Sequence, residues 1–332
     1  MRRTVAIGSL VLLSAGGSSA AQVAAPAEVK HFVFFSHERE RITEPSFVSH
    51  PNIVGAQLKY TWRDLEPERD RYDFSAVLND VVTLERHGKK LWIQLQDVSF
   101  SERQIVPDYL LSDPAFNGGA AREYDENGKF SGWVARRWDP AVRARLSKLL
   151  HALGDSLDGR IEGINLAETA ITMPDPKRHP AGFTYDGYAA AMKDIITAAK
   201  NAFPRSHVII YGNFMPGEAL PANDRGYLRG IYAHAATVGA GVGGPDILLH
   251  RPFQQKHSLP LIRERGPNVI AGMALQDGNL ADTNKTTMQR VTVEEIYRYA
   301  VDTLRLNYIF WGTEEPYYSA DVLPFLLTRR EP

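Results

Sequence analysis

The sequence predicts a single-domain α/β fold, an eight-stranded (β/α)8 barrel of the TIM-barrel type. Eight short apolar runs alternate with helical patterns between residues 30 and 332, and such alternation implies parallel strands joined by right-handed helical crossovers. The runs are apolar throughout, as is typical of strands covered on both faces. The length of 332 residues accommodates one barrel of about 250 residues with its loops.

The eight predicted strands follow one another at regular intervals. The sixth is the weakest, because it contains three glycines and a proline. In order, the strands are expected at His31–Ser36, Ile53–Leu58, Lys90–Gln96, Ile161–Leu166, His207–Tyr211, Gly241–Leu248, Asn268–Leu275 and Asn307–Trp311.

The helices between the strands carry recognisable end signals. Asp73 and Asp139 precede two of them as capping residues, and Thr292 with Glu295 forms a capping box before the last one. The helix around Leu259–Arg265 is expected to be short. The clearer helices are predicted at Phe74–His87, Pro140–Leu157, Tyr185–Phe203, Asp224–Thr237 and Val293–Leu306.

An open doubly wound sheet is the alternative fold. The first strand is followed by no glycine-rich phosphate-binding turn, which disfavours a dinucleotide-binding sheet. The longest insertion, residues 97–138, is rich in aromatic side chains and follows the third strand. We therefore expect it over the mouth of the barrel.

The amino terminus has the order of a secretory signal peptide. Arg2 and Arg3 precede a short apolar run, and small residues follow up to Ala21. We expect a signal peptide at residues 1–21, a disordered lead-in at 22–29, the barrel at 30–332, and a secreted or periplasmic protein. The apolar run is shorter than the roughly 20 residues that span a bilayer, so stable membrane insertion is not expected.

Composition narrows the classes of ligand. The 38 basic and 39 acidic residues nearly balance, which gives no electrostatic reason to expect nucleic acid. The chain has no cysteine, and no histidine pair has the spacing of a metal site. We expect no metal and no cofactor, and oligomeric state stays open.

The active site of such a barrel lies at the carboxyl ends of its strands. The residues there are amides, carboxylates and aromatics, which is the mixture that sugars require. Glu168, after the fourth strand, is the best catalytic carboxylate. Asp277 and Glu314 are the candidates for the second one, and Asp246 lies within the predicted sixth strand. The predicted substrate-binding residues are Trp311, Gln96, Asn165, Asn213, Tyr60, Trp62, Gln276, His37 and Tyr211.

Residues 55–67, GAQLKYTWRDLEP, followed by YDFS at 72–75, resemble the second βα unit of barrel glycoside hydrolases. The resemblance is to the large retaining-glycosidase clan, such as the family-42 β-galactosidases. It implies an acid/base glutamate after the fourth strand, where Glu168 stands, although Ala167 replaces the asparagine that normally precedes it. It implies a nucleophilic glutamate ending the seventh strand, where this chain has Gln276 and Asp277. The closing tryptophan of the eighth strand is matched by Trp311.

The sequence therefore predicts a secreted glycoside hydrolase that cleaves a polysaccharide or oligosaccharide by two-carboxylate chemistry. A retaining and an inverting mechanism both stay open. Because of Ala167 and Gln276, a carbohydrate-binding barrel that has lost hydrolysis is the alternative. A different hydrolase or lyase on the same barrel is a third possibility, since fold does not fix reaction.

Overall fold

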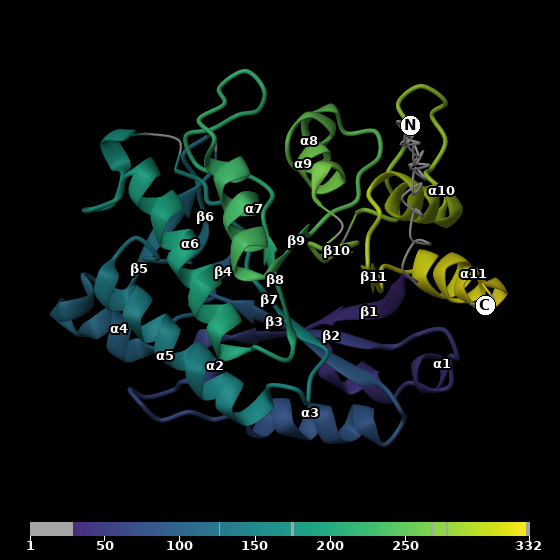
Figure 1. The fold of residues 1–332 in the computed structure, drawn as a ribbon, viewed down its shortest axis with the longest axis horizontal. Coiled ribbons are helices and arrows are strands. Elements are labelled where there is room, and N and C mark those ends of the chain that lie inside the picture. The colour runs from purple at the N-terminus through teal and green to yellow at the C-terminus, as the bar shows by residue number, and fades with distance from the viewer. Residues whose placement is uncertain (1–28, 126, 174–175, 267, 277, 330–332) are drawn as a thin grey trace, which may run out of the picture.

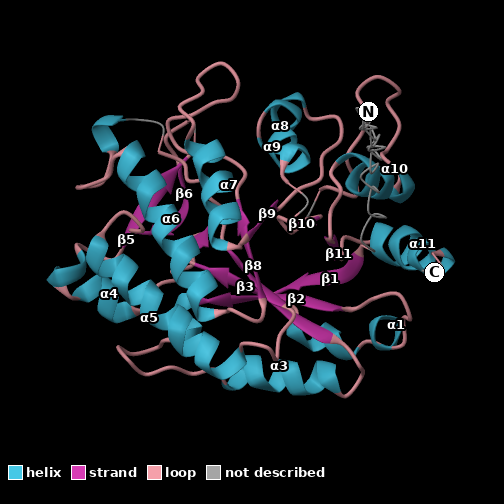
Figure 2. Cartoon of the chain, viewed as in Figure 1, coloured by secondary structure: helices cyan, strands magenta, loops and turns pink. Residues whose placement is uncertain are grey.

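The computed structural model describes residues 29–329 except 126, 174, 175, 267 and 277. Eight parallel strands close into a barrel in the order β1-β11-β10-β9-β8-β7-β3-β2, and helices enclose them on the outside (Figures 1 and 2). The predicted (β/α)8 barrel is confirmed. Its strands are β1 (Lys30–Ser36), β2 (Gly55–Thr61), β3 (Lys90–Gln96), β7 (Gly163–Leu166), β8 (His207–Tyr211), β9 (Gly241–Gly244), β10 (Ala271–Ala274) and β11 (Tyr308–Gly312).

Two helices begin where the sequence signals place them, but the helix at Ser75–Glu85 has Phe74, and not the predicted Asp73, at its N-cap position. Asp139 accepts from the backbone N–H groups of Ala141 and Val142 before α5, and Thr292 and Glu295 form the expected capping box before α10. The helices are α1 (Pro45–Val48), α2 (Trp62–Leu65), α3 (Ser75–Glu85), α4 (Asp108–Ser112), α5 (Pro140–Leu157), α6 (Tyr185–Ala202), α7 (Tyr227–Val238), α8 (Pro252–Lys256), α9 (Ser258–Glu264), α10 (Val293–Arg298) and α11 (Leu323–Thr328). Shorter turns are the 3-10 helices η1 (Arg39–Thr43), η2 (Pro114–Phe116) and η3 (Pro176–Arg178) and the π-helices η4 (Tyr299–Thr303) and η5 (Tyr318–Val322).

The strands β1, β3, β8, β10 and β11 divide their apolar side chains between two hydrophobic clusters. The inner cluster fills the barrel, and the larger outer cluster packs the strands against the helices. Along β11, for example, Tyr308 and Phe310 point inward, whereas Ile309 and Trp311 belong to the outer cluster. The inner cluster comprises Phe32, Phe34, Trp92, Ile209, Tyr211, Ala274, Tyr308 and Phe310.

The segment that resembles barrel glycoside hydrolases positions a helix. Trp62 Nε1 donates to Glu66 Oε2 over 2.9 Å, and Arg145 of α5 pairs with the other oxygen of the same carboxylate. Glu66 is fully buried, so the pair ties α2 to α5 inside the outer layer. The role of this segment is structural.

The insertion after β3 forms a small antiparallel sheet of β4 (Val98–Ser99), β6 (Phe130–Ala135) and β5 (Ala120–Tyr124). Two hydrogen bonds join the insertion to the first part of the loop after β7. Glu123 Oε2 accepts from the Thr172 backbone N–H over 3.1 Å, and Arg137 Nη1 donates to the Glu168 carbonyl oxygen over 2.7 Å. The insertion therefore borders the mouth of the barrel, as the sequence predicts.

The predicted signal peptide at residues 1–21, and all but the last residue of the lead-in, lie outside the described residues. Within the part of the chain that the structure describes, no helix combines the length and apolarity that crossing a membrane requires.

Candidate active site at the mouth of the barrel

Glu168 lies two residues beyond the end of β7, where it is largely buried but still reaches solvent. The peptide bond that follows Glu168 is fixed at both of its polar groups: Arg137 donates to the Glu168 carbonyl oxygen, and the N–H of Thr169 donates to the Tyr211 carbonyl oxygen over 3.0 Å. Asn213 Nδ2 donates to Glu168 Oε2 over 2.7 Å. These hydrogen bonds fix the orientation of the Glu168 side chain at the mouth of the barrel.

The electrostatic surroundings suit an acid. Burial raises the pKa of Glu168 to about 7, and the negative charge of Asp246 raises it too. The hydrogen bond from Asn213 and the positive charges of Lys59 and Arg137 act in the opposite direction. A carboxyl group with this pKa keeps its proton up to neutral pH, which a general acid requires.

Arg137 is the main support of the site. Its guanidinium makes a bidentate pair with Asp97, through Nε–Oδ2 at 2.7 Å and Nη2–Oδ1 at 2.6 Å. Nη1 donates both to the Glu168 carbonyl oxygen and, over 2.8 Å, to Tyr188 Oη. Arg137 is 2% exposed and Asp97 4%, so this buried pair anchors the loop that carries Glu168.

A pocket of about 230 Å³ opens at the ends of β1, β2 and β3. Two predicted substrate-binding residues, His37 and Gln96, line it together with Lys59 and Thr61. Burial lowers the pKa of His37 and the positive charge of Lys59 lowers it further, and the same charge partly opposes the rise in the pKa of Glu168. The charge of Lys59 therefore lies within electrostatic reach of the pocket and of the carboxylate. The loop at residues 98–105 supplies the opposite wall.

Asn165 and Tyr211 lie one layer deeper than predicted, inside the barrel. Gln57 Nε2 donates to Asn165 Oδ1 over 2.9 Å and to Tyr211 Oη over 2.8 Å, and Trp92 Nε1 donates to Asn165 Oδ1 over 3.2 Å. These four side chains are fully buried. They support the floor of the site and do not reach its surface.

The aromatic residues Tyr60, Trp62 and Trp311 lie outside the mouth. Tyr60 Oη donates a hydrogen bond to Asp80 on α3 over 2.7 Å, and Trp62 donates one to Glu66. Trp311 Nε1 donates to His31 Nδ1 over 3.2 Å, and its ring lies beside Phe325 of α11. All three belong to the outer cluster. Tyr60 and Trp311 point outward because side chains alternate along a strand, so we leave all three out of the proposed site.

Of the two predicted second carboxylates, Glu314 lies among the described residues. Asp277 lies outside the described residues. Glu314, after β11, is partly exposed and its Oε2 accepts from the Gly278 backbone N–H over 3.1 Å. Gln276 is partly exposed at the end of β10, and its carbonyl oxygen accepts from Asn279.

Two acidic side chains near Glu168 were not predicted from the sequence to be catalytic carboxylates. Asp246, after β9, raises the pKa of Glu168 and has a raised pKa of its own because of burial. Glu123, from the inserted sheet, is 1% exposed, and burial raises its pKa to about 7. The charges of Glu168 and Asp97 add to that rise, and Glu123 Oε1 has no hydrogen-bond partner.

Glu123 should make stability depend on pH. Burial raises the pKa of Glu123 in the folded protein from its usual 4.5 to about 7. The stability that the protonated side chain contributes is therefore fully present below pH 4.5 and is lost as the pH rises through 7. At pH 8 we expect Glu123→Gln to raise the free energy of unfolding by about 1–3 kcal/mol, from roughly 1.4 kcal/mol per pKa unit. Urea unfolding at pH 8 and pH 4.5 measures this. The gain should vanish at the lower pH and be absent from the exposed control Glu85→Gln; an equal gain at both pH values would contradict the assignment.

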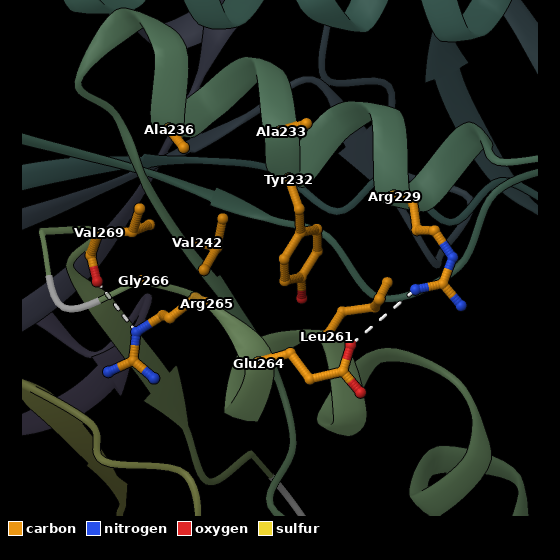
Figure 3. Close-up of a pocket in the computed structure, with 10 residues that line it drawn as sticks. All are labelled: Arg229, Tyr232, Ala233, Ala236, Val242, Leu261, Glu264, Arg265, Gly266 and Val269. Atoms are coloured by element: carbon orange, nitrogen blue, oxygen red, sulfur yellow. Dashed lines mark hydrogen bonds and ion pairs between the residues drawn. The ribbon is translucent and has the colours of Figure 1, made fainter.

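A second pocket, of about 220 Å³, lies on the outside of the barrel between α7 and α9 (Figure 3). Tyr232, Leu261 and Val242 form its apolar wall, and Arg265 Nε donates to the Val269 carbonyl oxygen over 2.9 Å. None of its lining residues is a predicted site residue. Among the described residues, no group of three or more histidine or acidic side chains is arranged to hold a metal ion.

No protein-family model and no curated protein sequence matches the chain. Solved structures do match over most of its length. The catalytic domain of β-amylase from Paenibacillus polymyxa has a TM-score of 0.57 at 9% identity, covering 86% of this chain and 93% of that one. Native xylanase 10B from Thermotoga maritima has a TM-score of 0.54 at 14% identity, covering 86% and 83%.

A GH5_18 variant from Streptomyces cattleya, solved in complex with Manβ1-4GlcNAc, has a TM-score of 0.55 at 13% identity and covers 86% of this chain and 70% of that one. At such identities a likeness establishes the fold. The chain therefore shares the (β/α)8 barrel of these glycoside hydrolases, at the level of the fold that the sequence resemblance implied.

Proposed function

We propose that the protein is a glycoside hydrolase that cleaves a polysaccharide or oligosaccharide, with Glu168 as the general acid. The observation that carries the proposal is Glu168 itself. It is a partly exposed carboxyl group at the carboxyl end of a barrel strand, held by Asn213 and with a pKa raised to about 7. A protonated carboxyl group in this position can donate to the oxygen of a glycosidic bond as that bond breaks.

The surroundings of Glu168 suit a carbohydrate on both sides. The polar pocket with His37, Lys59 and Gln96 lies toward β1, β2 and β3. Beyond Asn213, the rings of Phe214 and Phe253 stack at 5.0 Å with an interplanar angle of 21°, and Phe253 is 56% exposed. An exposed aromatic face packs against the apolar face of a sugar ring, while the polar pocket meets its hydroxyl groups.

Phe253→Ala should weaken substrate binding and leave the chemical step unchanged. A lost aromatic contact of about 0.5–1.5 kcal/mol corresponds to a rise in KM of roughly 2- to 10-fold. Steady-state kinetics on the polymer measures this, with Leu327→Ala, an equally exposed apolar residue on α11, as the control. A fall in kcat at constant KM would contradict a binding role.

Purified protein incubated with xylan, β-mannan and starch tests the proposal. We expect reducing ends to be released from at least one of these polymers. Binding to a polymer without release would instead favour the carbohydrate-binding barrel, which Ala167 and Gln276 motivate. Neither binding nor release on the three polymers would contradict both functions.

We also propose that the protein is exported, because residues 1–21 have the basic, apolar and small-residue order of a signal peptide. Expression of the full chain in a bacterial host should give a mature amino terminus near Gln22 in the periplasm or medium. Amino-terminal sequencing measures it, and an intact Met1 on cytosolic protein would contradict export.

A further inference from the structure

We propose that Asp246 is the second catalytic carboxylate of this site and acts as the general base that works together with the acid Glu168. The inference rests on the proposed hydrolase function and deepens it. It assigns the base to the strand β9, whereas the sequence resemblance implies a carboxylate on the next strand, β10.

Backbone hydrogen bonds fix the positions of the two carboxylates relative to each other. β7, β8 and β9 are consecutive in the barrel. The Thr169 N–H donates to the Tyr211 carbonyl oxygen over 3.0 Å, and the Gly212 N–H donates to the Gly243 carbonyl oxygen over 3.0 Å. These bonds tie the three strand ends together just where Glu168, Asn213 and Asp246 follow.

The side-chain amide of Asn279, which is buried, orients the Asp246 carboxylate. Asn279 Nδ2 donates to Asp246 Oδ1 over 2.8 Å, and Asn279 Oδ1 accepts from the Ile247 N–H over 2.8 Å. Asn279 is 2% exposed. Its two hydrogen bonds hold both the Asp246 carboxylate and the backbone next to it in place. Asp246 itself remains partly exposed. The arrangement repeats the one on Glu168, where Asn213 is the amide donor.

The two carboxylates are close enough to influence each other and the same neighbouring side chain electrostatically. Asp246 raises the pKa of Glu168, and both groups add to the rise that burial causes in the pKa of Tyr211. Tyr211 lies in the barrel floor, bonded to Gln57. Two neighbouring carboxyl groups with raised pKa values share protons readily, so one can serve as acid while the other is an ionised base.

The reaction then balances as a single displacement. The Glu168 proton moves to the glycosidic oxygen, which keeps the electron pair of the breaking bond to the anomeric carbon. A water oxygen forms the new bond to that carbon while Asp246 takes a proton from the water. The short aspartate side chain leaves room for the water between the carboxylate and the sugar, as inverting enzymes require. Proton exchange with solvent then restores both groups.

The test compares Asp246→Asn with wild type on whichever of xylan, β-mannan and starch the wild type cleaves. We expect kcat to fall by about 10²–10⁴-fold, the usual range for a lost general base, while polymer binding is retained. Asn279 can still donate to the new amide oxygen, so the fold should survive. The control Asp155→Asn changes an exposed aspartate on α5 and should keep wild-type kcat.

Two further readouts separate a base from a merely structural residue. Sodium formate should restore part of the activity of Asp246→Gly, because the small carboxylate can occupy the vacated space. NMR of the first product should show inverted anomeric configuration. Wild-type kcat in Asp246→Asn, or a retained configuration, would overturn this inference and leave the hydrolase proposal standing. A wild type that releases no reducing ends would overturn both.

Discussion

Glu168→Gln should lower kcat/KM on a cleaved polysaccharide by about 10²–10⁴-fold, the contribution typical of general acid catalysis. Glutamine keeps the size of the side chain and can still accept from Asn213 Nδ2, but it has no acidic proton for the leaving oxygen. Initial rates of reducing-end release measure the loss. The matched control is Glu85→Gln, an exposed glutamate at the end of α3, which should retain wild-type activity.

The dependence of kcat/KM on pH tests the assignment of Glu168 as the acid a second time. Since the pKa of Glu168 is raised to about 7, the acid form dominates below this pH and is lost above it. The value of kcat/KM should therefore fall as pH rises through about 7, and Glu168→Gln should lack this limb. A profile that stays flat from pH 6 to pH 9 in the wild type would contradict the assignment of the acid.

Arg137→Met should destabilise the protein by about 3–5 kcal/mol, the usual cost of removing one partner from a buried ion pair. The change leaves Asp97, which is 4% exposed, without the cation that pairs with both of its oxygens. It also removes the donor to the Glu168 carbonyl oxygen, so kcat should fall with stability. Urea unfolding and polymer kinetics measure the two effects.

A double-mutant cycle supplies the control for this prediction. In Asp97→Asn/Arg137→Met the uncompensated charge is gone, so the double variant should be more stable than the sum of the single changes predicts. Additive losses would show that the two side chains do not depend on each other. Arg137→Met at wild-type stability would contradict the role of the pair outright.

The barrel could be predicted from the sequence because each unit carries its own local signals. The capping residues Asp139 and Thr292 act as expected, and β3 and β8 have the predicted bounds. β9 is shorter than predicted, ending at Gly244. The last long helix gives way to a π-helical turn at Tyr299–Thr303, which periodicity alone does not distinguish from a continuous helix.

The site was harder to predict than the fold. Strands covered on both faces are apolar throughout, so the sequence does not show which alternate residues point inward. Trp311 was assigned to the mouth because it matches the closing tryptophan of the clan that the sequence resembles, and Tyr60 because it follows the second predicted strand, although both pack against helices. Glu168 was found because it directly follows an apolar strand. Asp246 follows a glycine-rich strand that gave a weak signal, and Glu123 reaches Thr172 from an insertion 49 residues earlier in the chain, a contact that only the folded chain creates.

The most direct test of Glu168 as a general acid compares two leaving groups. A 2,4-dinitrophenyl glycoside of the sugar that the wild type cleaves needs no proton, because dinitrophenolate leaves unaided, whereas the polysaccharide does need one. Glu168→Gln should lose about 10²–10⁴-fold in kcat/KM on the polysaccharide and far less on the dinitrophenyl glycoside. An equal loss on both substrates would show that Glu168 is not the proton donor.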